Sequence, residues 1–236
     1  MKIDFRLSSL PKKSDKSVNL KIDFHCHTNH SPDSIIVPRE LAAKAKKLGI
    51  IPAITDHNSI AVHKELRKLK MQFIPSEEIR TNKGDLIGLY LNEIIPKYTP
   101  FLEAIDSIKE QGGISYLPHM YDKTRHGVGI TELAKKVDII EIFNARCPFQ
   151  KYNDMAMEFA NKNKKIFGVG GDNHFLFEFG NNWVDVPNFD LNNPKELVKA
   201  LKSKQAKMHT RKAPIFVRGS TLVVKFAKKF FQGLTP

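Results

Sequence analysis

The chain has 236 residues, 41% of them hydrophobic and 27% charged, which is ordinary globular usage and excludes intrinsic disorder and collagen-like structure. Its 38 Lys and Arg against 25 Asp and Glu give a formal net charge of +13, which would attract nucleic acid, anionic lipid or a small phosphorylated molecule without selecting among them. The longest apolar runs are far shorter than the roughly 20 residues that cross a bilayer, and no charged-then-apolar leader opens the chain, so we expect neither a transmembrane segment nor secretion. Two cysteines cannot form a disulfide framework in a chain of this size, which favours a cytoplasmic location.

Strand-like and helical segments alternate from residue 20 onward. Short apolar runs bounded by turn residues predict seven strands, at residues 20–26, 50–55, 72–79, 86–91, 114–117, 139–143 and 166–169. Apolar spacing predicts helices at residues 39–48, 60–69, 101–110, 131–136, 150–161 and 195–202. The gap between the third and fourth strands is too short for a crossover helix, so we expect these two strands to pair like a hairpin. Seven strands interleaved with helices predict an α/β fold, most simply a barrel or near-barrel.

The two ends of the chain differ from this pattern. We expect residues 1–19 to form an N-terminal arm, residues 20–210 the main domain and residues 211–236 a basic and aromatic C-terminal tail. Helical spacing in the tail would put Phe226 and Phe230 on one side and the lysines largely on another. Such a helix could lie on a membrane surface, but we expect it to pack back on the domain or against a second subunit.

Histidines and acids gather where the predicted strands end. Because side chains alternate along a strand, Asp23, His25 and His27 should project from one side of the first strand. The ends of the other strands and the loops after them add the following residues, with Asp85 returned to the same edge by the hairpin: Asp33, His57, Glu77, Glu78, Asp85, His119, Glu141, Asn144, Asp172 and His174. The carboxyl ends of strands are where α/β enzymes build their sites, so we expect these side chains to meet at one rim.

The number of these residues predicts more than one metal ion. Five histidines and about four carboxylates exceed the three or four protein ligands that one zinc takes. Mixed imidazole and carboxylate ligands suit Zn, Mn or Fe, and the sequence does not choose among them. Closely spaced ions would lower the pKa of a bridging water and hold a phosphoryl group, so no serine or cysteine nucleophile is required. The four other histidines lie in predicted loops or helices, and we expect them at the surface: His30, His63, His126 and His209.

Five of these segments together resemble the polymerase and histidinol phosphatase (PHP) family. They read Asp-Phe-His-Cys-His-Thr at 23–28, Thr-Asp-His-Asn at 55–58, Pro-Ser-Glu-Glu-Ile at 75–79, Pro-His at 118–119 and Gly-Asp-Asn-His at 171–174. The resemblance runs from residue 21 to residue 185. It implies a distorted (β/α)7 barrel, similar to a TIM barrel, with a two- or three-metal centre. It also implies phosphoesterase activity or, in some members, a polymerase-associated nuclease.

The resemblance also divides the predicted ligands among the ions. His25, His27 and Asp172 would bind the first metal, His119 the second, and Asp33, His57 and His174 the third. The glutamate that bridges the first and second metals aligns with Glu78 rather than with Glu77. Many members have a histidine in a Gly-His pair that opens the fourth strand, where this chain has Asp85 after Gly84. An aspartate there would favour Mn or Mg, or else the second metal would bind weakly or not at all.

A phosphate ester also needs cationic partners from the protein. Arg125 and Arg146 follow two of the site-bearing strands, and the planar guanidinium group suits phosphate, so we predict that both bind substrate. The short loops after the strands favour a small phosphomonoester or nucleotide as the substrate.

We therefore predict a metal-dependent phosphoric ester hydrolase that uses a metal-activated hydroxide on a phosphomonoester of a small metabolite or nucleotide. One alternative is a nuclease or nucleic-acid-associated protein, whose binding would weaken steeply with salt. Nucleic acid is not the favoured partner, because no basic stretch interleaved with aromatic residues lies near the predicted ligands. Another alternative is a non-catalytic metal-binding regulatory module. The sequence does not determine the oligomeric state.

Overall fold

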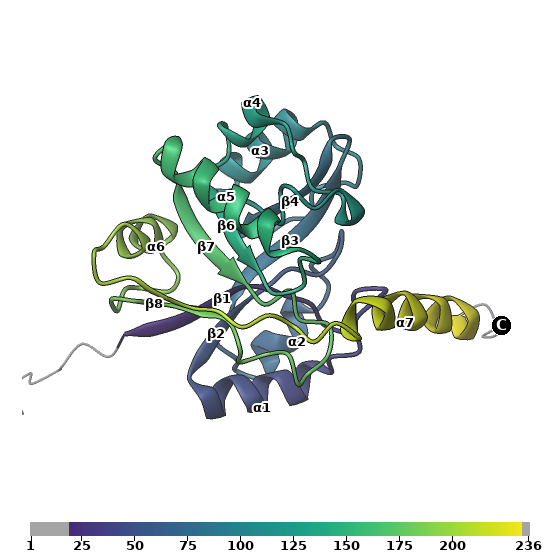
Figure 1. Ribbon diagram of the computed structural model, residues 1–236. Coiled ribbons are helices and arrows are strands. Elements are labelled where there is room, and N and C mark those ends of the chain that lie inside the picture. The colour runs from purple at the N-terminus through teal and green to yellow at the C-terminus, as the bar shows by residue number, and fades with distance from the viewer. Residues whose placement is uncertain (1–18, 233–236) are drawn as a thin grey trace, which may run out of the picture.

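The computed structural model describes residues 19–232, and residues 1–18 and 233–236 lie outside the described part (Figure 1). The predicted N-terminal arm, residues 1–19, therefore falls almost wholly outside the described residues. Within residues 19–232, no helix combines the length and apolar character needed to cross a membrane.

The strands of the described region form one curved sheet in the order β7-β6-β5-β4-β3-β2-β1-β8-β9 (Figure 1). They are β1 (Leu20–Cys26), β2 (Ile50–Ile54), β3 (Ile74–Thr81), β4 (Gly84–Leu89), β5 (Ile114–Leu117), β6 (Ile139–Asn144), β7 (Ile166–Gly170), β8 (Trp183–Val186) and β9 (Lys207–His209). A bridge between Cys26 and Asn173 joins the end of β1 to the loop after β7, so the first seven strands form a nearly closed barrel. The antiparallel pair β8 and β9 extends the sheet beyond β1.

Helices follow most of the barrel strands and cover the sheet. They are α1 (Pro38–Leu48), α2 (His63–Lys68), α3 (Phe101–Glu110), α4 (Thr131–Ala134), α5 (Gln150–Lys162), α6 (Pro194–Leu201) and α7 (Val217–Gln232), with a short 3-10 turn at Lys123–Arg125. In Figure 1, α3, α4 and α5 lie on one side of the molecule and α1 and α2 on the other. Pro38 opens α1, and Gly49 follows its last residue in the left-handed region, at φ 65°. These residues are typical of helix starts and stops, which is why the sequence marks this helix clearly.

The predicted architecture is confirmed, including the hairpin. β3 and β4 pair antiparallel with only two residues between them, and Arg80 lies opposite Asp85 in their register. β1–β2, β2–β3, β5–β6 and β6–β7 pair in parallel, as expected for strands joined by crossover segments. The prediction did not include β8 and β9, which are only four and three residues long.

The barrel is filled by side chains from strands that are not neighbours in the sheet. The rings of Phe24 on β1 and Tyr116 on β5 stack with centroids 5.6 Å apart, and both residues are fully buried. Gly168 on β7 leaves the room for this stack, since a Cβ atom there would lie 2.6 Å from the Tyr116 ring. The interior below the strand ends is therefore a packed apolar core, which confines polar chemistry to the rim.

The predicted helix in the C-terminal tail is present as α7, which extends away from the barrel (Figure 1). Val217 is buried at its start, whereas Val223, Phe226 and Phe230 are about two-thirds exposed or more. The ammonium group of Lys228 donates hydrogen bonds to three carbonyls of the β1–α1 loop, those of Asn29 at 2.8 Å, Ser31 at 2.8 Å and Ser34 at 2.6 Å. One side of α7 is thus attached to the domain, at a loop that also carries a predicted ligand.

Candidate metal centre

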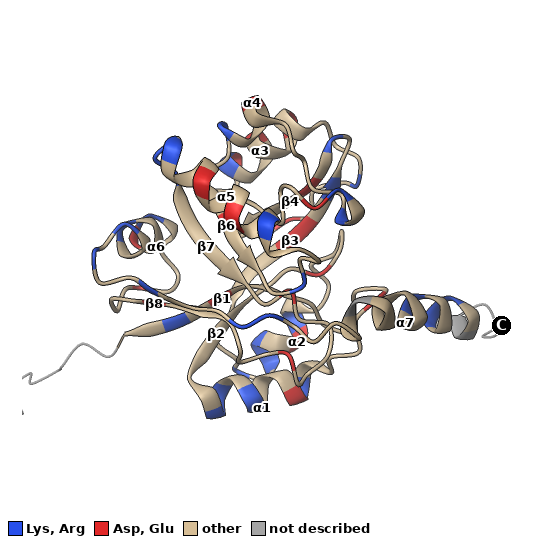
Figure 2. Ribbon diagram, in the orientation of Figure 1, with Lys and Arg blue, Asp and Glu red and all other residues tan. Residues whose placement is uncertain are grey.

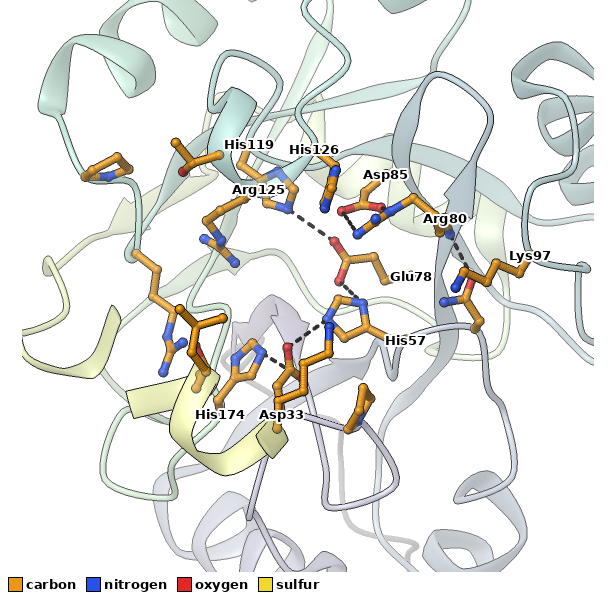
Figure 3. Close-up of a pocket in the computed structure, with 18 residues that line it drawn as sticks. Asp33, His57, Glu78, Arg80, Asp85, Lys97, His119, Arg125, His126 and His174 are labelled. Atoms are coloured by element: carbon orange, nitrogen blue, oxygen red, sulfur yellow. Dashed lines mark hydrogen bonds and ion pairs between the residues drawn. The ribbon is translucent and has the colours of Figure 1, made fainter. Parts of the chain in front are cut away.

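Histidines and carboxylates from six separate segments meet at the carboxyl ends of the barrel strands, and Figure 3 shows Asp33, His57, Glu78, His119 and His174 among them. Three overlapping groups each offer ligand atoms that all lie within 4.8 Å of one another: His25, His27 and Asp172; His25, Glu78 and His119; and His27, His57 and His174. Asp33 joins the third group, with its carboxylate oxygens 3.4 Å from Nε2 of both His57 and His174. The structure thus brings together every predicted metal ligand except Asp85.

Backbone hydrogen bonds join the end of β1, which carries His25 and His27, to the loop after β7, which carries Asp172. The amide of Asp172 donates to the carbonyl of His25 at 2.7 Å, and the amide of His27 donates to the carbonyl of Asn173 at 3.0 Å. Asp172 and His119 both have left-handed backbone conformations, with φ of 53° and 30°. Such conformations are unfavourable for residues other than glycine and concentrate at functional sites.

Not every acid at the rim belongs to the cluster. The pairing of β1 with β2 is irregular between Asp23 and Cys26, so the simple alternation predicted for β1 is interrupted there. The carboxylate of Asp23 accepts hydrogen bonds from the amide of Gly171 at 2.8 Å and the side chain of Asn173 at 2.7 Å. Asp23 therefore holds the loop after β7 in place, and its burial raises its pKa to about 7.

Hydrogen bonds at Nδ1 orient three of the histidines. The Nδ1 atom of His25 lies 3.1 Å from a Glu141 oxygen, and that of His174 lies 2.9 Å from the Asp172 carbonyl; both partners act as acceptors. The Nδ1 atom of His27 lies 3.1 Å from the Ser31 hydroxyl, which itself donates to a carboxylate at 2.9 Å. These three partners therefore accept the Nδ1 hydrogens, which leaves the Nε2 atoms facing the cluster. Hydrogen bonds to the far ring nitrogen orient histidine ligands for a metal in this way.

The resulting contacts bring imidazole nitrogens and carboxylate oxygens, all of them acceptors when unprotonated, close to one another. The Nε2 atoms of His25 and His27 are 3.1 Å apart, and each lies 3.4 Å from the same oxygen of Glu78. Two further buried oxygens, Oδ1 of Asp33 and Oδ1 of Asp172, have no hydrogen-bond partner among the described residues. Neutral imidazoles and carboxylates repel each other in this geometry unless protons or metal cations lie among them. Burial disfavours protonated His25, but the charges of Asp172 and Glu78 raise its pKa well above its usual range, which shows how strongly this position attracts positive charge. The residues present therefore fit a group of divalent metal ions.

The pKa shifts show how unevenly this cluster holds protons. Burial lowers the pKa of His27 to about 3, helped by the neighbouring His174 and His57. Burial also disfavours protonated His57, but the charges of Glu78 and Asp33 raise its pKa to about 9. The pKa of Glu78 lies well below its usual range, because His57 and His25 outweigh the effect of burial. The carboxylates therefore stay ionised and draw positive charge to themselves.

Glu78 lies at the centre of the cluster, whereas its neighbour Glu77 does not. Oε1 of Glu78 is 3.2 Å from Nε2 of His119, and Oε2 is 3.1 Å from Nδ1 of His57 (Figure 3). Glu77 is turned away and accepts a hydrogen bond from the amide of Ile95 at 3.0 Å. Burial raises the pKa of Glu77 to about 7. Of the two adjacent glutamates, Glu78 is therefore the one that faces the cluster, and its bridging role stays a prediction.

Comparisons with known proteins agree with this geometry. A family described as PHP-associated matches residues 150–206. An uncharacterized protein of Methanocaldococcus jannaschii is 36% identical over 186 residues, which cover 75% of each chain. The chain belongs to the PHP family.

Two solved structures have a similar PHP fold. The first, from Bacteroides vulgatus, is described as a two-domain protein containing a predicted PHP-like metal-dependent phosphoesterase; it covers 96% of this chain and 75% of its own, with 17% identity and a TM-score of 0.63. The second, from Bifidobacterium adolescentis, is described as a putative metal-dependent phosphoesterase; it covers 65% of this chain and 87% of its own, with 16% identity and a TM-score of 0.52. At these identities the likeness concerns the fold.

Asp85 is the predicted PHP ligand that stands apart. Its two carboxylate oxygens accept hydrogen bonds from Nε and Nη2 of Arg80, the second at 3.2 Å (Figure 3). Burial and the nearby Glu78 raise its pKa. It lines the same pocket as the cluster, and its role as a ligand stays a prediction.

The two predicted substrate arginines have different surroundings. Arg125 donates to Asn144 at 3.0 Å and contacts the carboxylate of Asp172, which places it beside the cluster. Arg146 is buried, and its Nε and Nη2 donate to the two oxygens of Glu178 at 2.9 and 2.8 Å. Both arginines line the pocket, and substrate binding by either stays a prediction.

Five residues of the cluster, Asp33, His57, Glu78, His119 and His174, line a cavity of about 450 Å3 (Figure 3). Residues from the rim line it together with Lys97 from the β4–α3 loop and with Thr221, Leu222 and Lys225 from α7. A volume of this size suits a small-molecule ligand.

Sequence reasoning missed some residues that shape this site. Nothing in the spacing marks Ser31, whose hydroxyl fixes the orientation of His27, or Lys225, which reaches the pocket from a distant helix. The expectation that four histidines lie at the surface is wrong for His63. That residue is 3% exposed, and its Nε2 lies 3.1 Å from the carbonyl of Ser76. Its place at the start of α2, facing the sheet, could not be read from composition.

Proposed function

We propose that this protein is a metal-dependent phosphoesterase that hydrolyses a phosphomonoester of a small metabolite or nucleotide. The observation that carries the proposal is the pair of Nε2 atoms of His25 and His27, 3.1 Å apart and both beside Glu78, which lines a cavity of about 450 Å3. Such a convergence of electron pairs is suited to cations and has no evident structural use.

The proposed ligands are the residues of the cluster, with Asp85 as an additional candidate. They are His25, His27, Asp33, His57, Glu78, Asp85, His119, Asp172 and His174. Two or three divalent ions held there, whether Zn, Mn, Fe or Mg, would lower the pKa of a water molecule and stabilise the charge of a phosphoryl group. Within the chain, Glu141 accepts the Nδ1 hydrogen of His25 and the amide hydrogen of His119, at 3.1 and 2.7 Å, which orients two of these ligands.

Arg125 is the best-placed side chain to contact the phosphoryl group directly. Its guanidinium group contacts Asp172 and lines the pocket, so it reaches from the ligand set into the space that a substrate would occupy. Its planar donors match two oxygens of a phosphate. Arg146 would contribute through the amino group that does not bind Glu178.

A small substrate is favoured over nucleic acid by the form of the site. The cavity has room for a metabolite, and Figure 2 shows Lys and Arg on α1, α6 and α7, which lie at separate places on the molecule. A nucleic-acid groove would instead concentrate basic residues along one track. Cleavage of short single strands remains an arm of the test below.

The proposal is tested by metal analysis followed by a phosphatase screen. The purified full chain should contain divalent metal, and with Mn, Zn or Mg it should hydrolyse phosphomonoesters faster than oligonucleotides. His25→Ala and Asp172→Asn should each abolish turnover and lower the metal content while leaving the circular dichroism spectrum unchanged. His30→Ala, at an exposed histidine outside the cluster, is the matched control and should retain both. Unchanged hydrolysis by either cluster variant would refute the assignment.

A further inference from the structure

The charged side chains that line the pocket are unevenly paired. Three arginines each meet a carboxylate: Arg80 with Asp85, Arg125 with Asp172 and Arg146 with Glu178. The two lysines that line the same cavity, Lys97 and Lys225, do not. Among residues 19–232, neither ammonium group lies within 4 Å of a carboxylate.

The lysines reach the pocket from two different parts of the chain. Lys97 belongs to the β4–α3 loop, and Figure 3 shows it on the Arg80 side of the pocket, away from Arg125. Its ammonium group lies 4.6 Å from the centroid of the Tyr98 ring. Lys225 comes from α7, one turn before the Lys228 that binds three carbonyls of the β1–α1 loop. Because residues three apart share a side of a helix, this attachment holds the side of α7 that carries Lys225 against the domain, where Lys225 lines the pocket.

Neither lysine is among the groups that would bind the phosphoryl group. Under the proposed function, the charge of that group is balanced by metal ions in the cluster and by Arg125. Two further cations in a cavity of about 450 Å3 are then available to a second part of the same molecule. An ammonium group is a compact donor on a flexible stem, which suits carboxylate and phosphate alike.

We infer that Lys97 and Lys225 form a subsite for a second anionic group, carried by the alcohol part of the substrate. The inference rests on the proposed function and narrows it to phosphomonoesters that bear a carboxylate or a second phosphate. Helix α7 is then part of the substrate-binding wall of the pocket. Thr221 and Leu222, one turn before Lys225, line the same wall.

Three non-hydrolysable probes of equal chain length test the subsite: propylphosphonate, 3-phosphonopropionate and propane-1,3-diphosphonate. Their dissociation constants are measured by calorimetry on metal-loaded protein from which free metal has been removed. We expect at least one two-anion probe to bind about 10-fold more tightly than propylphosphonate, the size of one charge-assisted hydrogen bond. The carboxylate and phosphonate arms distinguish which second anion the subsite takes.

Variants of the two lysines test whether they cause the tighter binding of the two-anion probes. Lys225→Met and Lys97→Met should each reduce the ratio between the probes, the double variant should abolish it, and Lys225→Arg should retain most of it. Lys229→Met is the matched control, because Lys229 is exposed on α7 and does not line the cavity. It makes the same charge change and should leave the ratio as in the parent protein.

Each outcome has a separate meaning. Binding of propylphosphonate with no preference for a second anion, or a preference that survives the double lysine variant, would overturn the subsite while leaving the phosphoesterase proposal standing. Failure of all three probes to bind, together with no hydrolysis of 4-nitrophenyl phosphate, would overturn both. An equal loss of the ratio in Lys229→Met would mean that general surface charge, rather than a subsite, attracts the anions.

Discussion

Two buried polar regions lie next to each other at the rim of the barrel, and they differ in how their charges are matched. In the pair formed by Arg146 and Glu178, two donors meet two acceptor oxygens at 2.9 and 2.8 Å. One of these oxygens also accepts the amide hydrogens of His174 and Phe175, at 3.0 and 2.9 Å. In the histidine cluster, the Nε2 atoms of His25 and His27 face each other at 3.1 Å. Burial of a matched pair serves the structure, whereas burial of mismatched groups points to a ligand.

The sharpest test of this contrast compares two adjacent glutamates. Glu78→Gln removes a charge from the centre of the cluster, and we expect kcat/KM to fall by about 10^3-fold or more, since metal ions contribute several kcal/mol to such reactions. Glu77→Gln should change kcat/KM by less than about 3-fold at pH 7, because burial already raises the pKa of Glu77 to about 7 and an amide resembles its protonated form. Metal content and kcat/KM, measured on both variants, check the prediction. A larger loss in Glu77→Gln would place the bridging residue one position earlier.

A substitution in the Arg146–Glu178 pair should lower the free energy of unfolding and leave metal binding unchanged. Arg146→Met leaves the carboxylate of Glu178 buried without its main partner, and we expect the free energy of unfolding to fall by about 3–5 kcal/mol. The double variant Arg146→Met/Glu178→Leu should recover part of this loss, because it removes the unpaired charge as well. Urea denaturation monitored by circular dichroism gives both values. A change below 1 kcal/mol together with a raised KM would instead support the predicted role of Arg146 in substrate binding.

The groups that orient the ligands should have an intermediate effect. Glu141 accepts hydrogens from the His25 ring, the amide of His119 and the Tyr116 hydroxyl, so it links the cluster to the core. Glu141→Gln keeps the shape but weakens the acceptor, and we expect metal affinity or kcat/KM to fall by about 10–100-fold, as is typical of such partners. Competition with a metal indicator measures the affinity. An unchanged affinity would show that the His25 ring is held by packing alone.

The sequence predicted the barrel because its strands are apolar runs separated by helices with clear starts and stops, as at Pro38 and Gly49. The rim was predictable because the ends of parallel strands share an edge of the sheet, so the sequence alone places His25 and His57 together. Contacts between distant segments were not predictable in this way. Ser31 and Lys225 depend on how a loop and the last helix fold back, and β9 is three exposed residues with no apolar pattern. The burial of His63 was unpredictable for the same reason, because it depends on how α2 packs against the sheet.

The smallest expected effect is on the pH dependence of stability, and it comes from His63, a buried histidine whose ring has a hydrogen-bond partner. Burial lowers its pKa from 6.5 to about 4, although the carbonyl of Ser76 favours the protonated ring. As the pH falls below 6.5, the unfolded chain takes up this proton before the folded protein does, so stability is lost between pH 6.5 and pH 4. Relative to His63→Gln, the parent protein should lose about 1 kcal/mol more between pH 7 and pH 5.5. Urea denaturation at the two pH values measures this difference, and the same comparison with His30→Gln, at an exposed position, should show none. Equal losses in the parent and in His63→Gln would mean that the folded and unfolded chains bind the His63 proton equally, so that burial does not lower the pKa of this ring.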